Sequence, residues 1–140
     1  LPNIRTELQD ASVCREEWKD SADVVLCDVP CSGLGIIRKK PEIRFKNPDE
    51  IQTLPEIQAR ILANCAQYVK KGGTLVYSTC TILQRENEDV VRAFLTENPE
   101  FEAVSWTHPV CGERADGMVT LLPPVHNTDG FFIAKMHRKV

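Results

Sequence analysis

Two cysteines follow short apolar runs, where their thiols could act on a substrate. Cys31 lies in the segment 28–33 (DVPCSG), and Cys80 lies in the segment 78–81 (STCT). A thiolate can form a covalent intermediate that splits one difficult reaction into two easier steps. Added to C6 of a cytosine ring, it makes C5 able to attack an electrophilic methyl group. A carboxylate such as Asp28 can hold the ring while charge develops on it.

A cysteine that follows a buried strand is more often an inert packing residue than a nucleophile. Two such cysteines after neighbouring strands, one of them within a Pro-Cys turn, bring the two interpretations close to even. The residue types alone therefore leave packing and catalysis both open.

The elements that must position these cysteines alternate between strands and helices. Short apolar runs predict strands, and apolar residues at helical spacing between them predict helices. In order, these are a strand at Val24–Cys27, a helix at Asn47–Tyr68, a strand at Thr74–Ser78, a helix that starts at Glu86 and stops at Asn98-Pro99, and strands at Phe101–Trp106 and Gly130–Lys135. This order is typical of an α/β sheet, and the closing pair of strands predicts an antiparallel hairpin.

A further strand is predicted at Ile4–Ser12, ending at Asp10. Ligands of doubly wound sheets bind beyond the carboxyl ends of the strands. Three polar or reactive sites fall at such ends: Asp10, the segment 28–33 and the segment 78–81. Ends of adjacent strands lie about 5 Å apart, so Cys31 and Cys80 could face one cavity if their strands are neighbours.

The composition is that of a soluble globular protein, with 42% hydrophobic and 26% charged residues in 140. No apolar run is long enough to predict a membrane span. We interpret the six cysteines as reduced thiols of a cytoplasmic protein. The net charge of −3 argues against a protein that coats nucleic acid. A basic stretch is the local exception, and it is either a solvated loop or a phosphate-binding surface: Arg38, Lys39, Lys40, Arg44 and Lys46.

Taken together, these motifs resemble the Nop/Sun RNA cytosine-5 methyltransferases, above all the bacterial Sun/Fmu branch that methylates small-subunit (16S) ribosomal RNA. The matching pieces run in order along the chain: 28–33 (DVPCSG) with Gly35, Arg38 and Pro41-Glu42, then 72–81 (GGTLVYSTCT), 86–88 (ENE) and 129–135 (DGFFIAK). The resemblance implies a Rossmann-like fold of the class I methyltransferases, with S-adenosylmethionine as cofactor and RNA as partner.

The resemblance also implies a role for each matching residue. Cys80 matches the nucleophile, and Cys31 matches the second cysteine, which is tied to release of the methylated RNA. Asp28 matches the carboxylate between the cofactor's methionine end and the target base. The implied cofactor-binding residues are Asp10, Asp28 and Pro30, and the implied RNA-binding residues are Arg38, Lys39, Lys40 and Arg44.

The family's glycine-rich cofactor loop lies upstream of Asp10 and has no counterpart here, since 33–35 (GLG) lacks the third glycine of a dinucleotide fingerprint. We therefore expect residues 1–140 to be the C-terminal half of a catalytic domain, inactive by itself. The strand at Val24–Cys27 would then expose an apolar edge. This predicts that the chain self-associates, or that Leu1–Glu16 is poorly ordered.

Three other functions compete with this interpretation. The chain could be a noncatalytic RNA-binding or assembly module, or a thiol-based redox protein, although neither reactive cysteine lies in a Cys-x-x-Cys motif. A DNA cytosine-5 methyltransferase ranks lower, because it would not need Cys80. No metal site is predicted: His108 and Cys111 have a ligand-like spacing, but no paired Cys-x-x-Cys accompanies them.

Overall fold

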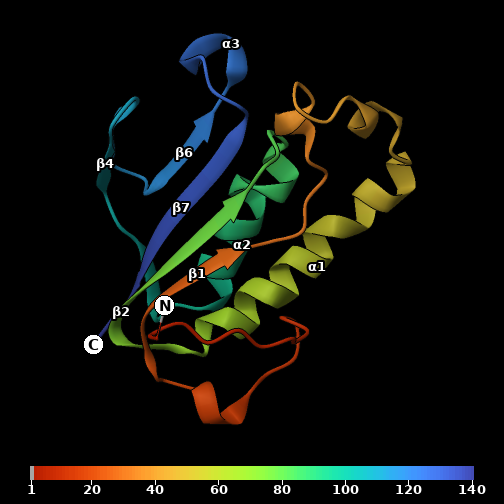
Figure 1. Cartoon of the computed structure of the whole chain (residues 1–140). Helices are drawn as coiled ribbons and strands as arrows, with labels where there is room; N and C mark the ends of the chain where they lie inside the picture. The colour runs from red at the N-terminus through yellow and green to blue at the C-terminus, as the bar shows by residue number, and fades with distance from the viewer. Residues whose placement is uncertain (1) are drawn as a thin grey trace.

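A five-stranded sheet forms the centre of the computed structural model, which describes residues 2–140. The strand order is β1-β2-β7-β3, and β6 also pairs with β7 (Figure 1). The strands are β1 (Ala22–Asp28), β2 (Val69–Thr79), β3 (Phe101–Ala103), β6 (Met118–Leu121) and β7 (Phe131–Arg138).

The sheet is mixed, with one parallel pair at its edge. β1 pairs with β2 in parallel, whereas β7 is antiparallel to β2, β3 and β6. β6 and β7 are joined through the short helix α3 (Pro123–His126), and β3 also pairs with β7. The predicted α/β class with an antiparallel end is therefore confirmed.

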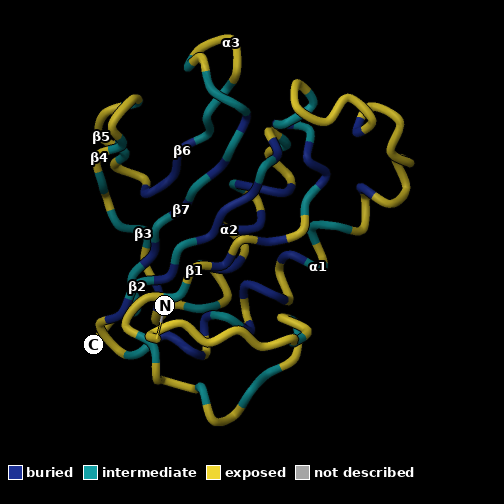
Figure 2. The backbone as a smooth tube through the Cα atoms, in the orientation of Figure 1, coloured by how far each residue is buried: buried dark blue, intermediate teal, exposed yellow. Residues whose placement is uncertain are grey.

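Two helices, α1 (Pro48–Ala66) and α2 (Glu88–Glu97), pack on the same face of the sheet. Figure 1 shows α2 behind the strands and α1 along the β1 side. Leu62, Tyr77, Val91 and Phe132 are among the fully buried residues of the core between helices and sheet. In Figure 2 this core follows β2, β7 and the inner sides of the helices.

The opposite face of β1 and β2 is not covered by a helix of the described chain (Figure 1). Val24 and Leu26 are 63% and 68% exposed on this face, although both are apolar residues of a strand. β1 is also the edge strand of the described sheet. The predicted exposed apolar edge is therefore present, while self-association stays a prediction.

The helix α1 begins and ends close to the predicted positions. Asn47 caps it, because its side-chain oxygen accepts a hydrogen bond from the Asp49 backbone at 3.0 Å. Pro48 occupies the first turn, where a missing backbone donor costs little. No helix of the described residues is long and apolar enough to cross a membrane.

The strand predicted at Ile4–Ser12 is wrong, because this segment forms no strand. No strand of the described residues lies beside it to accept its backbone hydrogen bonds. The segment instead runs along α1, where the Asn64 amide donates to the Ala11 carbonyl at 2.8 Å and the Val13 carbonyl at 3.2 Å. Leu1 lies outside the described residues, and the prediction of poor order in this region is not tested.

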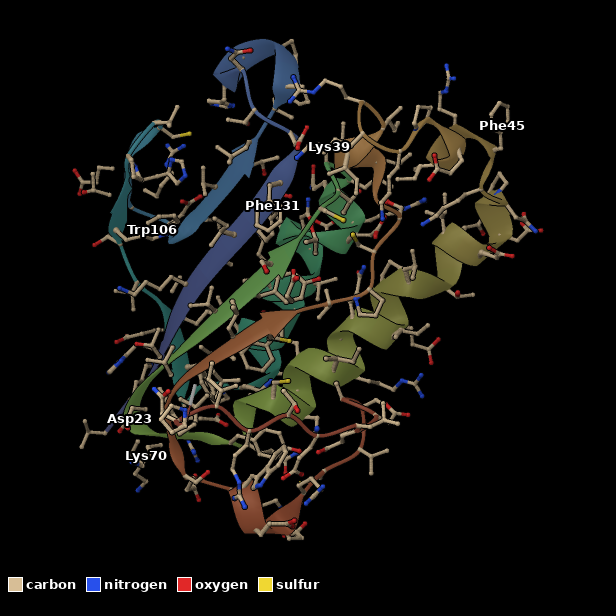
Figure 3. The ribbon with its side chains drawn as sticks, in the orientation of Figure 1. Asp23, Lys39, Phe45, Lys70, Trp106 and Phe131 are labelled. Carbon is tan, nitrogen blue, oxygen red and sulfur yellow. The ribbon has the colours of Figure 1, made fainter. Side chains whose placement is uncertain are left out.

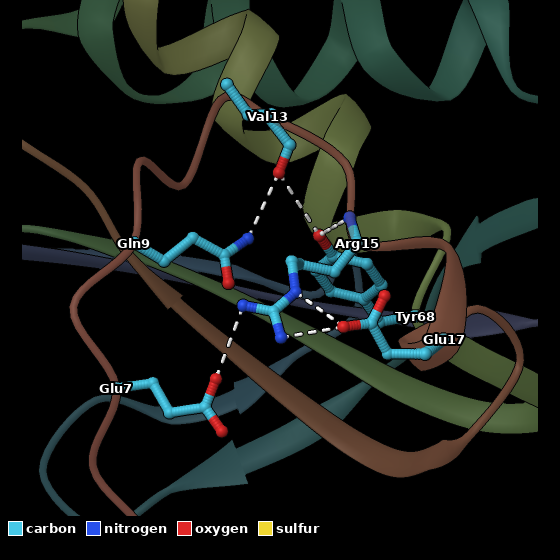
Figure 4. A network of polar contacts seen from close by, with 6 residues as sticks. All are labelled: Glu7, Gln9, Val13, Arg15, Glu17 and Tyr68. Atoms are coloured by element: carbon cyan, nitrogen blue, oxygen red, sulfur yellow. Dashed lines mark hydrogen bonds and ion pairs between the residues drawn. The ribbon is translucent and has the colours of Figure 1, made fainter.

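Arg15 connects this N-terminal segment to the rest of the molecule. Its backbone donates to the Tyr68 hydroxyl at 2.9 Å, and its guanidinium pairs with Glu7 at 3.3 Å and Glu17 at 2.6 Å (Figure 4). The paired carboxylate of Glu17 raises the pKa of Arg15. These contacts tie residues that precede β1 to the end of α1.

The segment between β3 and β6 was predicted only in part. The predicted strand at Phe101–Trp106 divides into β3 and β4 (Trp106–His108), and β4 forms a hairpin with β5 (Gly112–Arg114). The Trp106 indole donates to the Gly117 carbonyl at 2.9 Å, which fastens this hairpin to the start of β6.

Candidate active site

The loops that carry Cys31 and Cys80 leave the sheet side by side. β1 ends at Asp28 and β2 at Thr79, and Asp28 is in register with Ser78 across the parallel pair. Because parallel strands present their carboxyl ends at one edge, both loops begin at the same place. The structure brings the Cys31 and Cys80 sulfur atoms to 3.1 Å.

These thiols lie in a cavity of about 380 Å³, called here the thiol cavity. Both cysteines are half-buried and unbridged. The cavity is lined by Cys31, Gly33, Ile36, Lys40, Glu42, Ile43, Lys46 and Cys80. It therefore joins two thiols, two cations and one carboxylate on a partly apolar surface.

The environment of Cys31 favours its protonated form. Burial, together with the neighbouring Cys80 thiol, raises the pKa of Cys31 from 9.0 to about 12. At neutral pH, Cys31 therefore keeps its proton and can donate a hydrogen bond to the Cys80 sulfur.

The two loops are also connected to each other by hydrogen bonds. The Ser32 and Thr81 hydroxyls lie 2.7 Å apart, and both residues are fully buried. Gly33 turns the chain with a φ of 76°. Gly35 then donates from its backbone to the Cys80 carbonyl at 3.0 Å, and its own carbonyl accepts from the Gly130 backbone at 2.8 Å. The spacing of the thiols therefore depends on contacts among three segments.

Asp28 lies next to the thiol loops but does not line the thiol cavity. It is exposed, and its Oδ1 accepts a hydrogen bond from the Ser78 hydroxyl at 2.8 Å. It lines a separate hollow of about 260 Å³ with Leu26, Val76, Ser78, Phe131 and Ile133. Pro30 is exposed between this hollow and Cys31, and its carbonyl accepts from the Gln58 amide at 2.9 Å.

Asp10 is not brought to these groups. It lies in the N-terminal segment on α1, where its Oδ1 accepts from the Ser12 hydroxyl at 2.7 Å and the Ser12 backbone at 2.9 Å. These hydrogen bonds lower the pKa of Asp10. It lines neither the thiol cavity nor the Asp28 hollow.

The predicted basic residues divide into distinct environments. Arg38 and Lys39 form ion pairs with Asp129, and these cations lower the pKa of that carboxyl. Lys40 lines the thiol cavity, whereas Arg44 donates to the Pro41 carbonyl at 3.2 Å. Figure 3 shows Lys39 near the upper end of β2 and β7, far from the Asp23–Lys70 ion pair at the other end of the sheet.

Several residues of the site were given no role there by their sequence pattern. Lys46 donates to the Ser32 carbonyl at 2.9 Å and lines the thiol cavity. Gln58, Glu86 and Asn87 are fully buried behind the two loops. The run 86–88 (ENE) carries polar residues at a helix start, which is the usual composition of an exposed first turn. Only the fold shows that its first two residues turn inward.

The spacing of His108 and Cys111 has a structural explanation. The His108 Nδ1 accepts from the Val110 and Cys111 backbones, each at 3.2 Å, at the turn between β4 and β5. No group of three or more His, Cys, Asp or Glu residues in the described part of the chain could hold a metal ion.

A family model described as 16S rRNA methyltransferase RsmB/F matches residues 3–137. The chain belongs to this family. The probable ribosomal RNA small subunit methyltransferase B of Bacillus subtilis (strain 168) is 43% identical over 146 residues, which cover 99% of this chain and 33% of that protein. Membership confirms the resemblance that the cysteine motifs indicated.

Two solved structures share the fold. The crystal structure of PH0851 has a TM-score of 0.85 at 37% identity and covers 93% of this chain and 30% of its own. A methyltransferase homolog protein from Pyrococcus horikoshii has a TM-score of 0.66 at 31% identity. The match covers 83% of this chain and 39% of the chain of that protein. The chain thus spans about a third of the length of the relatives that it matches.

Proposed function

We propose that this chain carries the cysteine chemistry of methyl transfer from S-adenosylmethionine to C5 of a cytosine in RNA, with 16S ribosomal RNA as the substrate. The observation that carries the proposal is the pair of thiols 3.1 Å apart in a cavity with Lys40 and Lys46, in a chain of the RsmB/F family. Small-subunit rRNA methyltransferases among the relatives support the class of substrate.

Cys80 is the nucleophile in this proposal, and Cys31 assists it. The raised pKa of Cys31 keeps that thiol neutral, so the thiolate that attacks C6 is assigned to Cys80. A bond forms between the Cys80 sulfur and C6, and the electron pair of the C5–C6 double bond becomes available at C5. C5 would use it to bond to the methyl carbon, whose bond to the sulfonium sulfur of bound S-adenosylmethionine would break with its electron pair on that sulfur.

Release reverses the addition after the methyl group has been transferred. A base takes the proton from C5, the C5–C6 double bond forms again, and the C6–S bond breaks with its electron pair on Cys80. Cys31 can stabilise the departing Cys80 thiolate by a hydrogen bond across 3.1 Å while keeping its own proton. This accounts for two cysteines in one cavity.

Asp28 and Pro30, which lie next to the thiol loops, are the cofactor-binding residues of this proposal. The exposed carboxylate of Asp28 at the end of β1 fits the ammonium group of a methionine moiety, and S-adenosylmethionine when bound supplies an electrophilic methyl group. The family resemblance implies that Asp10 lies beside the adenine end of the cofactor. In the structure the Asp10 carboxylate accepts hydrogen bonds from Ser12 instead. Asp10 would therefore reach the cofactor only if the N-terminal segment followed a different path.

RNA reaches this site only with the target base out of its stack, since a thiol cannot attack C6 within a duplex. Lys40 and Lys46 at the cavity are suited to the phosphates next to that base, and Arg44 is a further cation on the same loop. Arg38 and Lys39 are partly neutralised by Asp129 and would contribute less.

We also propose that residues 1–140 act as part of a longer catalytic domain in the cytoplasm and are inactive alone. The chain spans about a third of its relatives, and its sequence has no glycine-rich cofactor loop. The rest of the domain would cover the open face of β1 and β2.

The test is covalent trapping with RNA that carries 5-fluorocytidine, where fluorine at C5 blocks the release step. The chain and a protein extended upstream to the length of its relatives are each mixed with this RNA and S-adenosylmethionine. We expect an adduct with the extended protein, mapped to Cys80 by mass spectrometry and lost in Cys80→Ala. With unmodified RNA, Cys31→Ala should accumulate the adduct that the parent protein releases.

An extended protein that binds S-adenosylmethionine but never forms the adduct would contradict the proposal. RNA binding that is unchanged in Cys80→Ala, without any adduct in the parent, would instead support the noncatalytic RNA-binding module. Binding of S-adenosylmethionine, measured by calorimetry for both proteins, separates a missing cofactor site from missing cysteine chemistry.

A further inference from the structure

Glu86 and Asn87 are adjacent, fully buried and polar, and the proposed reaction does not use them directly. They lie where the short helical turn at Gln84–Glu86 meets α2, immediately after the Cys80 loop. A buried carboxylate or amide destabilises a fold unless hydrogen bonds satisfy it. The partners of these two side chains therefore indicate their purpose.

Glu86 holds the loop of Cys31 from both sides. Its Oε2 accepts a hydrogen bond from the Ser32 backbone at 2.9 Å and a second from the Gln58 amide at 2.9 Å. The same Gln58 nitrogen donates to the Pro30 carbonyl at 2.9 Å. The residues before and after Cys31 are therefore fixed by one carboxylate–amide pair.

Asn87 holds the loop of Cys80 in the same manner. Its Nδ2 donates to the Thr81 carbonyl at 3.1 Å, and its Oδ1 accepts from the Thr79 hydroxyl at 2.6 Å. The residues before and after Cys80 are therefore fixed by one amide. A carboxylate in its place would keep the acceptor but lose the donor.

The two arrangements share a rigid support. The Tyr77 hydroxyl in β2 donates to the Glu86 carbonyl at 2.6 Å, and the Ser32 and Thr81 hydroxyls join the loops at 2.7 Å. Two neighbouring residues on one backbone thus set both cysteine loops. The 3.1 Å between the thiols follows from that common anchor.

We propose that Glu86, through Gln58, is the positioning residue for Cys31 and that Asn87 is the positioning residue for Cys80. The catalytic consequence rests on the proposed function, whereas the placement of the thiols does not. Loss of one anchor should disturb one cysteine more than the other, which a general loss of stability would not do.

The first test measures how fast iodoacetamide alkylates each cysteine of the folded chain at fixed pH, by mass spectrometry. Glu86→Met removes the oxygen that accepts from both the Ser32 backbone and the Gln58 amide. The alkylation rate of Cys31 should then rise about fivefold, the effect of one lost net hydrogen bond on an opening equilibrium, while that of Cys80 changes less. In Asn87→Asp, Cys80 should respond by a similar factor and Cys31 less. Cys14 and Cys111 serve as internal references.

The matched control is Asp89→Asn, which replaces an exposed carboxylate at the start of the same helix that accepts a hydrogen bond from Gln84. Its two cysteine rates should equal those of the parent. If Glu86→Met or Asn87→Asp does not fold, two other variants weaken the same anchors. Gln58→Met removes the hydrogen bonds from Gln58 to Glu86 and Pro30, and Thr79→Val removes the one from Thr79 to Asn87. Unchanged cysteine rates, or a parallel rise at all cysteines in these variants, would overturn the proposal.

The second test uses the extended protein with unmodified RNA and S-adenosylmethionine. Glu86→Met should accumulate the covalent adduct, as Cys31→Ala does, whereas Asn87→Asp should form it more slowly. Selective alkylation without any adduct in the parent would contradict the proposed function and leave the positioning intact. An adduct in the parent that neither variant alters would contradict positioning and leave the function intact.

Discussion

The Cys31 and Cys80 sulfur atoms lie 3.1 Å apart, and the surroundings of Cys31 favour its protonated form. Burial and the neighbouring sulfur stabilise the neutral form of Cys31 and raise its pKa to about 12. A neutral donor next to a nucleophile suits a reaction in which a thiolate must first attack and later depart. A neutral Cys31 therefore supports the proposed division of roles, in which Cys80 attacks and Cys31 assists.

The raised pKa of Cys31 predicts a pH-dependent stability. Below the ordinary pKa of 9.0, folded and unfolded chains both keep this proton, so the group adds no pH dependence. Between 9.0 and about 12, the unfolded chain loses the proton and the folded chain retains it, so the free energy of unfolding falls as pH rises.

Urea denaturation across this pH range, in the presence of a reductant, measures the effect. Cys31→Ser should show a shallower alkaline decline than the parent, because its hydroxyl does not titrate there. Cys111→Ser is the control and should retain the parent's slope. Equal slopes for the parent and Cys31→Ser would show that Cys31 does not hold its proton more tightly when folded.

Among individual residues, the sequence predicted the pair of cysteines but not the buried residues that hold their loops. Cys31 and Cys80 are recognisable because each ends an apolar run next to a turn-forming residue. The positioning role of Glu86 and Gln58 is not recognisable in the same way, because nothing in a local pattern distinguishes a buried polar residue from an exposed one. Asp10 was placed at a strand end, and that placement failed with the strand.

The elements around the site are held together by close backbone contacts. Gly35 lies between the Cys80 loop and the start of β7: a Cβ added to it would lie 2.1 Å from the Gly130 carbonyl oxygen and 2.8 Å from the Cys80 carbonyl oxygen. Both neighbours are backbone atoms, so relief requires the elements to move apart. Only glycine therefore fits at position 35 without displacing the neighbouring backbone.

Gly35→Ala should destabilise the fold by about 3 kcal/mol, the upper range for overpacking a well-packed site. Gly112→Ala is the matched control, because its added Cβ meets nothing within 4 Å and encounters only the strain of a φ of 74°. That strain costs about 1 kcal/mol. Chemical denaturation measures both, and a Gly35→Ala effect no larger than the control would contradict the close packing described.

Strong local periodicity explains which elements were predictable. The helix at Asn47–Tyr68 carries a long apolar periodicity, and the strands around Val24 and Thr74 carry continuous apolar runs. The structure has α1, β1 and β2 there. The hairpin of β4 and β5 has three-residue strands, too short for a pattern. The strand expected at Ile4–Ser12 failed for another reason, since a strand depends on a partner that its own sequence cannot specify.

At the scale of the whole molecule, the sheet is covered on one face only. The helices α1 and α2 bury residues such as Leu75 and Tyr77, while Leu26 and Val76 on the other face line an open hollow with Phe131. Parallel strands are almost always covered on both faces. The described chain therefore carries an apolar surface that a second layer would normally bury.

This surface predicts that the chain associates with a second copy of itself. The edge strand β1 has unpaired backbone groups along one side, and Val24 and Leu26 add apolar area to it. Light scattering over a range of concentrations should show a mass above that of the monomer. Leu26→Lys should shift the distribution toward monomer, because a charged residue on an edge opposes strand pairing.

Val125→Lys is the control for this substitution, since Val125 is equally exposed, at 68%, but lies on α3 away from β1. It should leave the association unchanged, which separates an effect of location from a general effect of added charge. A monomer at every concentration would contradict the prediction and show that the open face is tolerated in water. Association that Leu26→Lys and Val125→Lys weaken equally would show that the contact does not depend on β1.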